Sequence, residues 1–350
     1  MAAAGVAALL VGPGADLRYL TGYHALPLER LTLLVARADG RHCLVVPQLE
    51  RPRAEAAETG VELQDFRETD DPYTVVARCL DGVAPAATLA AGDRLWSMFL
   101  LGLQATLPAA RWVRASEVTK HLRMRKTPEE VSVLRRAGQA IDRVHAAVPN
   151  LLRAGRTEAE VGRNIADLII AEGHSEVNFV IVGSGPNGAS PHHETGERVI
   201  AAGDAVVVDI GGTLDGYCSD ATRNYVVSTA PDGFADAHAA LESAQQAACA
   251  AVRPGVTAES VDAAARDVLT EAGYGELFVH RTGHGIGLEE HEDPYIVAGN
   301  ATVLEPGMAF SVEPGVYVPG RFGMRIEDIV VVTEDGCERL NTIDRAAVTV

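Results

Sequence analysis

Two aspartates lie in neighbouring segments that are otherwise mostly apolar. Asp209 follows three valines in DAVVVDIGG, and Asp220 lies in YCSDATRNYVV. Asp215-Gly216 between them can form a tight turn, so we expect two neighbouring strands that bring both carboxylates close together. Like charges at short range repel and raise one pKa unless a cation lies between them. Taken alone, such a pair is more typical of turn or edge positions than of a metal site.

Three further segments contribute a histidine and two glutamates. His284 lies in the glycine-rich segment RTGHGIGLEEHEDP, Glu313 ends an apolar strand in SVEPGVYV, and Glu327 lies inside an apolar strand in GMRIEDIVVV. An ion pair usually explains one buried glutamate, and Arg325 is a candidate partner for Glu327. Too few basic residues lie nearby to neutralise the whole set. Four carboxylates and one imidazole suit a pair of divalent cations, which can polarise a carbonyl group for hydrolysis without a covalent intermediate.

The elements that carry these residues are predicted in the second part of the chain. Thr127 with Glu130, and Thr157 with Glu160, have the spacing of a helix capping box. Thr257 is expected to cap a third helix. Strand-like runs lie between and after these helices, at residues 178–183, 204–212, 217–227, 308–318 and 324–333. Strands and helices in blocks predict an α+β domain with an antiparallel sheet.

The first part of the chain is predicted to be a separate α/β domain. Segments 31–37 and 42–48 have the pattern of two strands joined by a turn at Ala38-Asp39-Gly40. A helix is expected after them, ending at Gly60. The basic segment KHLRMRKTPEE is better explained as a solvated linker than as a binding patch. We therefore expect domains at 1–117 and 118–350.

Composition excludes several classes of partner and location. The chain has 48 acidic and 30 basic residues and a net charge of −18, whereas nucleic-acid binding needs a positive surface. Five scattered cysteines without a C-x-x-C pair argue against a disulfide framework and favour a reducing compartment. No basic region precedes the first apolar stretch, and no apolar run reaches the roughly 18 residues of a membrane span. A cytoplasmic protein that binds neither nucleic acid nor membrane is expected.

Taken together, these segments resemble the pita-bread metallopeptidases, which include Xaa-Pro dipeptidase (prolidase), aminopeptidase P and methionine aminopeptidase. The resemblance covers the five ligand positions in order, PNGASPHH (186–193) and HGIGLEEHEDP. DLRYLTGY and ERLTLLVARADGRHCLVVP resemble the creatinase-type N-terminal domain, which methionine aminopeptidases do not need. The resemblance implies an α/β creatinase-like domain followed by an α+β pita-bread catalytic domain.

The resemblance also implies an activity. It favours hydrolysis of the bond before proline in dipeptides, with aminopeptidase P acting on longer Xaa-Pro peptides as the alternative. A non-catalytic binding protein of the same fold is the alternative of another class, and such a protein would be expected to lose ligands. A homodimer is implied as well.

The family's metal ligands carry over to five residues of this chain. Asp209 would bind one metal through both oxygens, and Asp220 and Glu327 would bridge two metals. His284 and Glu313 would complete the second metal, and Glu313 would also take the proton of the bridging water. The ions expected are two divalent cations per subunit, manganese or cobalt before zinc or iron.

Substrate-binding roles carry over to two histidines and an arginine. His192 and His291 would bind the substrate or stabilise the tetrahedral intermediate, as oxyanion donors do. Arg325 resembles the family arginine that lies near the site. His193 stays open as an alternative to His192, because Ser190 stands where the family usually has leucine.

Other signals are set aside. GSGPNG (183–188) matches the G-x-G-x-x-G pattern, but Pro186 and the residues after it do not open a helix, which argues against dinucleotide binding. Cys218 would share a strand face with Asp220, but a small buried core residue explains it better. His174 and His280 are expected to be structural.

Overall fold

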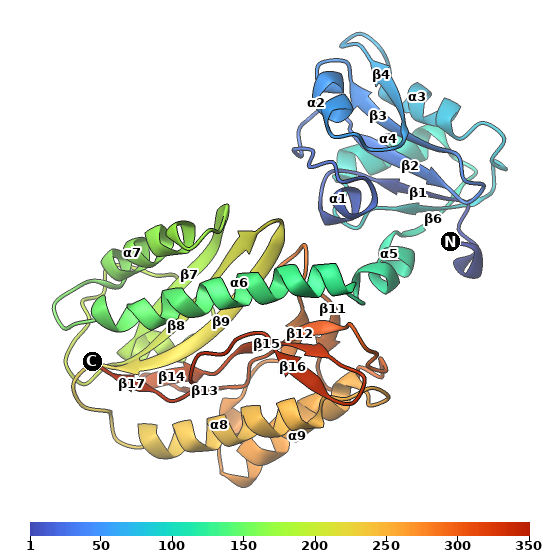
Figure 1. The fold of residues 1–350 in the computed structure, drawn as a ribbon. Coiled ribbons are helices and arrows are strands. Elements are labelled where there is room, and N and C mark those ends of the chain that lie inside the picture. The colour runs from blue at the N-terminus through green and yellow to red at the C-terminus, as the bar shows by residue number, and fades with distance from the viewer. The chain divides into compact units, whose positions relative to one another are not determined.

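The computed structural model describes all 350 residues, which form two compact units, Met1–Arg123 and Met124–Val350 (Figure 1). The sequence placed the domain boundary between residues 117 and 118. That position lies inside helix α5 (Ser116–Arg123), which belongs to the first unit. None of the helices combines the length and the apolar character needed to cross a lipid bilayer.

The first unit is built on one six-stranded mixed sheet with strand order β4-β3-β2-β1-β5-β6. Its other elements are β1 (Ala8–Val11), α1 (Ala15–Thr21), β2 (Leu33–Arg37), β3 (His42–Pro47), α2 (Arg51–Ala56), β4 (Glu62–Phe66), α3 (Pro72–Cys79), β5 (Thr88–Ala91), α4 (Ser97–Thr106) and β6 (Arg111–Arg114). The predicted strand pair is confirmed as β2 and β3, which are antiparallel. Gly40 in their turn has a positive φ of 86°, which glycine adopts readily.

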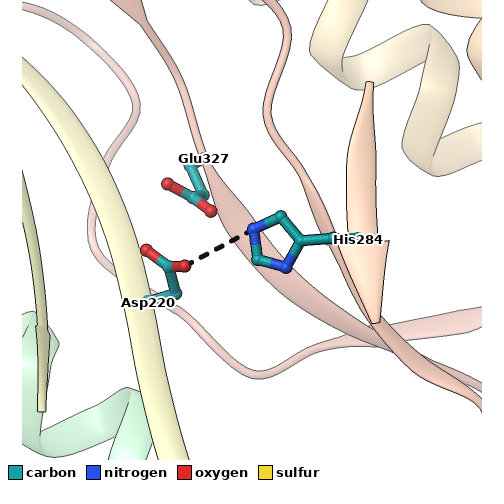
Figure 2. Close-up of side chains that lie close together, drawn as sticks. All are labelled: Asp220, His284 and Glu327. Atoms are coloured by element: carbon teal, nitrogen blue, oxygen red, sulfur yellow. Dashed lines mark ion pairs between the residues drawn. The ribbon is translucent and has the colours of Figure 1, made fainter. Parts of the chain in front are cut away.

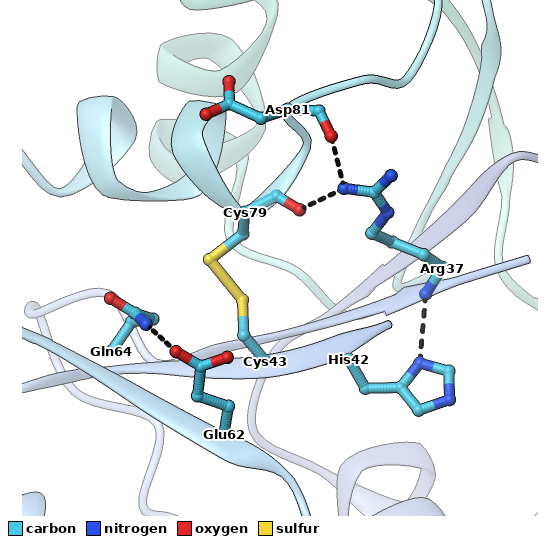
Figure 3. The surroundings of a disulfide bond; sticks show 7 residues. All are labelled: Arg37, His42, Cys43, Glu62, Gln64, Cys79 and Asp81. Atoms are coloured by element: carbon cyan, nitrogen blue, oxygen red, sulfur yellow. Dashed lines mark hydrogen bonds between the residues drawn. A yellow bond between two sulfur atoms is a disulfide. The ribbon is translucent and has the colours of Figure 1, made fainter. Parts of the chain in front are cut away.

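A disulfide joins Cys43 on β3 to Cys79 at the end of α3 (Figure 3). Arg37 on β2 braces the same helix end by donating to the carbonyl oxygens of Cys79 at 3.0 Å and Asp81 at 2.8 Å. The cysteine pattern argued against disulfides, and the structure contradicts that expectation for this pair. The two residues are 36 positions apart, and packing of the helix against the strand brings them together, so their spacing carried no signal.

The second unit contains a four-stranded sheet β17-β9-β8-β7, a five-stranded sheet β11-β10-β12-β15-β16 and the hairpin β13-β14. Its elements are α6 (Pro128–Ala147), α7 (Glu158–Ala171), β7 (Glu176–Ser184), the 3-10 turn η3 (Gly185–Ala189), β8 (Ala205–Leu214), β9 (Tyr217–Val226), α8 (Phe234–Ala251), α9 (Ala258–Glu271), β10 (Gly283–Gly285), β11 (Glu292–Ile296), β12 (Ala309–Val312), β13 (Gly315–Val318), β14 (Phe322–Arg325), β15 (Asp328–Val332), β16 (Cys337–Arg339) and β17 (Val348–Thr349). The α+β prediction is confirmed.

The helices lie on the outer sides of these sheets (Figure 1). Side chains of α6 and α7 pack with β7, β8 and β9 in one apolar core, and those of α8 and α9 pack with β12 to β15 in another. The inner faces of the strands are therefore left to polar groups. An amphipathic helix on one side of a sheet is the usual way to bury such a face.

The predicted helix starts are confirmed, with one difference in detail. The capping boxes at Thr127 and Thr157 both form. Thr257 occupies the cap position of α9, but its side chain makes no capping hydrogen bond. Ser260 stands where the other two helices have glutamate, and its hydroxyl donates to the carbonyl oxygen of Thr257 at 2.6 Å. The sequence therefore placed the helix start correctly at Thr257, but the chain lacks the glutamate that would complete a capping box there.

The second unit also contains an internal repeat that the sequence analysis missed. Helices α7 and α9 begin one hundred residues apart, each after a threonine cap. Thr157 forms an isolated antiparallel bridge with Val199, and Thr257 forms the corresponding bridge with Val303. The likeness is carried by a few glycine, threonine and apolar positions, so it is apparent only once both helix starts are seen to make the same contacts.

The basic segment near the boundary is not the solvated linker that was expected. Part of it forms α5, where Arg123 pairs with Asp16 at 2.7 Å. Lys126 follows in the second unit and donates to Glu292 at 2.6 Å, with both side chains buried. Charged residues of this segment are therefore held in ion pairs, which a reading of charge alone does not reveal.

A buried carboxylate ties several elements of the second unit together. Asp328 is fully buried and pairs with Arg223 at 2.6 Å, Arg339 at 2.9 Å and Arg345 at 3.0 Å. Gln245 of α8 donates to it at 2.9 Å. Burial alone would raise the pKa of Asp328, but the three guanidinium groups outweigh it and the pKa is lowered. Asp328 therefore remains charged and joins β9, β15, β16 and α8.

We expect Asp328→Ala to lower the free energy of unfolding by about 3–5 kcal/mol, because it leaves buried guanidinium groups without a partner. The folded-state pKa of Asp328 lies below the unfolded value, so its contribution is present above the unfolded pKa and is lost as pH falls through the folded pKa. Urea unfolding followed by circular dichroism measures both effects. The exposed Glu334→Ala is the control, with a change within about 0.5 kcal/mol. Equal stability of the two variants would contradict the role of Asp328.

Candidate metal centre

One cavity of about 550 Å³ in the second unit collects the predicted site residues. Its wall is formed by Phe179, Ile181, Pro191, His192, Asp209, Asp220, His280, Arg281, His284, Glu290, His291, Glu313, Arg325 and Glu327. All five predicted metal ligands, both predicted histidines and the predicted arginine therefore face the same space. They come from segments more than a hundred residues apart in the chain.

The β8–β9 hairpin positions the two aspartates. Asp209 lies opposite Thr222, and Asp220 lies opposite Gly211. Because side chains alternate along a strand, this register puts both carboxylates on one face of the hairpin. The turn at residues 215–216 has positive φ at both positions, 49° and 88°, as a two-residue hairpin turn of type I′ requires. The predicted turn and the predicted closeness of the strands are confirmed.

The two glutamates lie where strands break. The run predicted at 308–318 divides into β12 and β13 after Glu313, and the run at 324–333 divides into β14 and β15 at Glu327. The prediction that Glu327 lies inside a strand is therefore wrong. Strand β14 pairs with β13, whereas β15 pairs with β12, so the chain must change sheets at these residues. A continuous apolar run in the sequence conceals such a change.

His284 lies in the short strand β10, in close contact with β12. A side chain at Gly283 would overlap the carbonyl oxygen of Ser311, so glycine is required for this approach. The backbone N–H of His284 donates to the Ser311 hydroxyl at 3.0 Å, and that hydroxyl donates to Glu313 Oε1 at 3.0 Å. Ser311 therefore links the backbone of one predicted ligand to the carboxylate of another.

Asp220, His284 and Glu327 converge on one point (Figure 2). Their potential ligand atoms all lie within 4.8 Å of one another, and all three residues are buried. His284 Nε2 is 3.7 Å from Asp220 Oδ2 and 3.2 Å from Glu313 Oε1. Glu313 thus borders the cluster through the imidazole.

Asp209 borders the same cluster through a shared hydroxyl. Thr222 Oγ1 lies 2.8 Å from Asp209 Oδ1 and 2.7 Å from Glu327 Oε2, and it accepts from Arg325 Nε at 3.0 Å. Arg325 also pairs with Asp209 Oδ2 and donates to the Tyr317 hydroxyl at 2.7 Å. The sequence suggested Glu327 as the partner of Arg325, but the structure places the ion pair at Asp209.

A cation would stabilise the charges of the cluster. Burial, reinforced by the neighbouring carboxylates, raises the pKa of Asp220 and of Glu327 well above their usual values. Burial would also raise the pKa of Glu313, but the hydrogen bond and charge of His284 lower it. Glu327 Oε1 is buried and has no hydrogen-bond partner. A divalent cation would provide that partner and offset the repulsion, so these oxygen and nitrogen donors fit a metal such as manganese, cobalt, iron or zinc.

His291 is held as a neutral imidazole beside the cluster. Its ring centre lies 3.9 Å from that of His284. Burial, together with the charges of His284 and Arg281, lowers the pKa of His291 to about 4. Arg281 Nη2 lies 3.4 Å from His291 Nδ1 and can donate to it, which leaves the proton on Nε2. A neutral imidazole with a proton on Nε2 can donate a hydrogen bond to a bound carbonyl oxygen.

The structure separates the two histidines of the 186–193 loop. His192 lines the cavity, whereas His193 Nε2 contacts Glu158 Oε2 at 2.8 Å. Glu158 is fully buried at the start of α7 and also accepts from the backbone and hydroxyl of Ser184 and from Asn187. This set of contacts fixes the loop, in which His192 lines the cavity and His193 does not. The geometry therefore favours His192 over His193, whose alternative role stayed open in the sequence.

The glycine pattern in the same loop serves packing. GSGPNG ends β7 and forms the 3-10 turn η3 rather than an α-helix. A side chain at Gly323 on β14 would overlap the carbonyl oxygen of Gly188, so the loop and the strand touch through their backbones. This contact explains Gly188, and a side chain at Gly183 would in turn crowd the backbone of Gly188, so no dinucleotide is needed to account for these two glycines.

Sequence reasoning missed several residues of the cavity wall. His280 was expected to be structural, but it lines the cavity, and its Nε2 accepts from the Tyr317 hydroxyl at 2.9 Å while its Nδ1 lies 2.7 Å from the carbonyl oxygen of Arg281. Arg281 and Glu290 were also missed. No motif marks them, because their position depends on how the glycine-rich segment folds around His284.

Two residues assigned to the core from sequence are buried outside the cavity wall. Cys218 is buried, and burial raises the pKa of its thiol to about 12. A thiol with so high a pKa is a poor metal ligand near neutral pH. His174 is buried and contacts the Ser219 hydroxyl at 2.9 Å, as a structural histidine does.

Comparisons with known proteins show the family to which both parts of the chain belong. The family model "Metallopeptidase family M24" matches residues 132–334, and "Creatinase/Prolidase N-terminal domain" matches residues 1–125. The "Probable dipeptidase PepE" of Mycobacterium tuberculosis is 54% identical over 99% of this chain and 93% of its own length. The Xaa-Pro dipeptidase of Lactobacillus helveticus is 36% identical over 93% of this chain and 90% of its own length.

Solved structures give the same result. Dipeptidase PepE from Mycobacterium ulcerans superposes with a TM-score of 0.95 at 53% identity, covering 100% of this chain and 94% of that one. A prolidase from Thermococcus sibiricus superposes with a TM-score of 0.94 at 35% identity, covering 100% and 96%. The predicted creatinase-like and pita-bread architecture is therefore confirmed.

We expect Asp220→Asn to lose bound metal, because the substitution removes one negative ligand from the buried cluster. Metal content after dialysis against manganese, measured by atomic emission, tests this. Asp215→Asn is the matched control, since Asp215 lies in the turn of the same hairpin and is no part of the cluster. Full manganese content in Asp220→Asn would remove this residue from the ligand set.

The stabilisation by manganese is expected to increase with pH. In the metal-free protein the pKa values of Asp220 and Glu327 are raised on folding, so their contribution to stability decreases as pH rises from the unfolded pKa towards the folded pKa. Bound metal keeps these carboxylates ionised and removes that loss. Thermal unfolding with and without manganese at about pH 5.5 and about pH 8 measures the difference. A shift in Tm that is independent of pH would contradict this account.

Proposed function

The chain belongs to metallopeptidase family M24, and from this premise we propose that it hydrolyses the peptide bond before proline in Xaa-Pro dipeptides. The observation that carries the proposal is the single cavity that brings the five ligands, His192 and His291 together. Relatives named dipeptidase or Xaa-Pro dipeptidase match this chain over almost its whole length, which supports the dipeptide as substrate.

The proposed ligand set is the one that the sequence suggests. Asp209, Asp220, His284, Glu313 and Glu327 would together hold two divalent cations, with Asp209 contributing to one, His284 and Glu313 to the other, and Asp220 and Glu327 to both. Such cations, manganese or cobalt by preference, would supply Lewis-acid chemistry for activating the scissile carbonyl group and the attacking water. Arg325 and Thr222 orient Asp209 through the contacts described above.

The remaining groups handle protons and charge. Glu313 is held ionised by His284, so it can accept a proton from the attacking water and deliver it to the leaving nitrogen. His291 presents an Nε2–H that can donate to the oxygen on which negative charge develops, and His192 lines the same cavity from the 186–193 loop, where it can contact the substrate. Residues 186–193 and 281–291 thus supply substrate contacts, and the strands supply the metal ligands.

The proposal extends to the state of the protein in the cell. We infer a homodimer and a cytoplasmic location from the family resemblance. The Cys43–Cys79 pair belongs to the first unit, and none of the cavity residues does, so the proposed chemistry does not involve this disulfide.

The decisive experiment compares an Xaa-Pro dipeptide with the matching Xaa-Pro tripeptide, using metal-stripped protein resupplied with manganese or cobalt. We expect cleavage of the dipeptide. His192→Ala should lower kcat about a hundredfold while metal content stays unchanged, because a donor to the substrate is lost but no ligand is. Loss of metal in His192→Ala would mean that its role is misassigned.

Three other outcomes discriminate between the alternatives. Cleavage of the tripeptide would establish the aminopeptidase P activity, whereas cleavage of the dipeptide alone establishes the dipeptidase. Cleavage of neither peptide by protein with confirmed bound metal would overturn the proposed substrate. Binding of an Xaa-Pro peptide without turnover would favour a non-catalytic binding protein of the same fold.

A further inference from the structure

One carboxylate in the cavity wall takes no part in the metal centre. Glu290 lines the same cavity as the ligands and is half-buried. It does not belong to the cluster of potential ligands around His284. No hydrogen bond or ion pair holds its side chain. A carboxylate that is partly removed from water and has no partner is available to a cation that enters the cavity.

The other carboxylates of the wall all have partners. Asp209 pairs with Arg325, Glu313 and Asp220 lie beside His284, and the Thr222 hydroxyl contacts Glu327. Arg281 is the other arginine of the wall, and it does not contact Glu290 either. Its guanidinium lies 4.5 Å from the centre of the Tyr295 ring and contacts His291. The charge of Glu290 is therefore not neutralised from within the wall.

The surroundings of Glu290 indicate the shape of its ligand. Glu290 shares the cavity wall with Phe179 and Ile181, which are two residues apart on β7 and therefore point to the same face of the strand. Both of these apolar side chains are only half-buried. An aliphatic chain can lie against such apolar residues while its charged end reaches a carboxylate.

We propose that Glu290 selects substrates whose first residue carries a positive charge, so that lysine or arginine before proline is preferred. This inference rests on the proposed function, which places the first residue of an Xaa-Pro dipeptide in this cavity. The long methylene chain of such a residue contacts the apolar wall, and its ammonium or guanidinium group pairs with the Glu290 carboxylate. Glu290 then determines specificity and does not act on the reacting bond.

The test compares kcat/KM for lysyl-proline, leucyl-proline and glutamyl-proline with metal-loaded wild-type protein and variants. We expect wild type to favour lysyl-proline over glutamyl-proline. Glu290→Gln should lower the ratio of lysyl-proline to leucyl-proline about three- to tenfold, the range expected for a partly exposed ion pair. The loss should appear mainly in KM, because the interaction is the same in the ground state and the transition state. Glu290→Lys should reverse the preference towards glutamyl-proline.

The controls separate this inference from folding and from the proposed function. Glu289→Gln changes the neighbouring carboxylate, which does not line the cavity, and should leave the ratio unchanged. Metal content and Tm report whether each variant is folded, and Glu290→Gln is sufficient if Glu290→Lys does not fold. An unchanged ratio in Glu290→Gln would overturn the role of Glu290.

Failure of the proposed function has a different signature. In that case wild-type protein with bound metal would hydrolyse none of the three dipeptides. Calorimetric binding of lysyl-proline and leucyl-proline to wild type and Glu290→Gln would then measure the same charge preference without turnover. Equal affinity ratios in the two proteins would overturn the inference in that experiment as well.

Discussion

The mutual repulsion of carboxylates in a buried space is the constraint on which the second unit depends. Asp209, Asp220, Glu313 and Glu327 share one cavity wall, and Arg325 and His284 are the nearest cationic or potentially cationic groups. Without further positive charge, part of the set must hold protons, as the raised pKa values of Asp220 and Glu327 indicate. Divalent cations would offset this repulsion. The same repulsion therefore accounts for the metal affinity of the site and for the raised carboxylate pKa values of the metal-free protein.

The strands can hold such a cluster because the side chains on their two faces make different contacts. On β9, Asp220 lines the cavity and the Thr222 hydroxyl contacts Asp209, while Arg223 points away and pairs with Asp328. Arg223 also donates to the carbonyl oxygen of Glu327 at 2.6 Å. The Arg223–Asp328 ion pair therefore fixes the backbone at the break between β14 and β15. The side chain of Glu327, which lies at this break, belongs to the carboxylate cluster on the other side. A buried charge network is costly in itself, and here it locates a ligand that local backbone preference does not.

The sequence predicted the parts of this arrangement that depend on local signals. Asp209 and Asp220 were placed together because a two-residue turn links adjacent strands, and the capping boxes marked the starts of α6 and α7. The α+β class of the second unit followed from the order of its helices and strands. The roles of the metal ligands, in contrast, came from the resemblance to the pita-bread metallopeptidases. The position of Glu327 was missed because its strand break depends on which partner strand pairs on each side. The Cys43–Cys79 disulfide was missed for a similar reason, since packing of distant segments creates that contact.

The residues of the cavity wall that sequence reasoning missed share a physical property. His280, Arg281 and Glu290 lie outside the ligand set, so the repulsion that governs the cluster does not constrain them. The ligands have chemical roles that few side chains can fill, whereas a wall residue must only fit the space and leave the cavity open. Glu290 has no structural partner, so a different residue there would alter substrate preference without disturbing the metal centre. Selectivity among first residues can therefore change while the hydrolytic chemistry stays the same, because the two depend on separate groups of side chains.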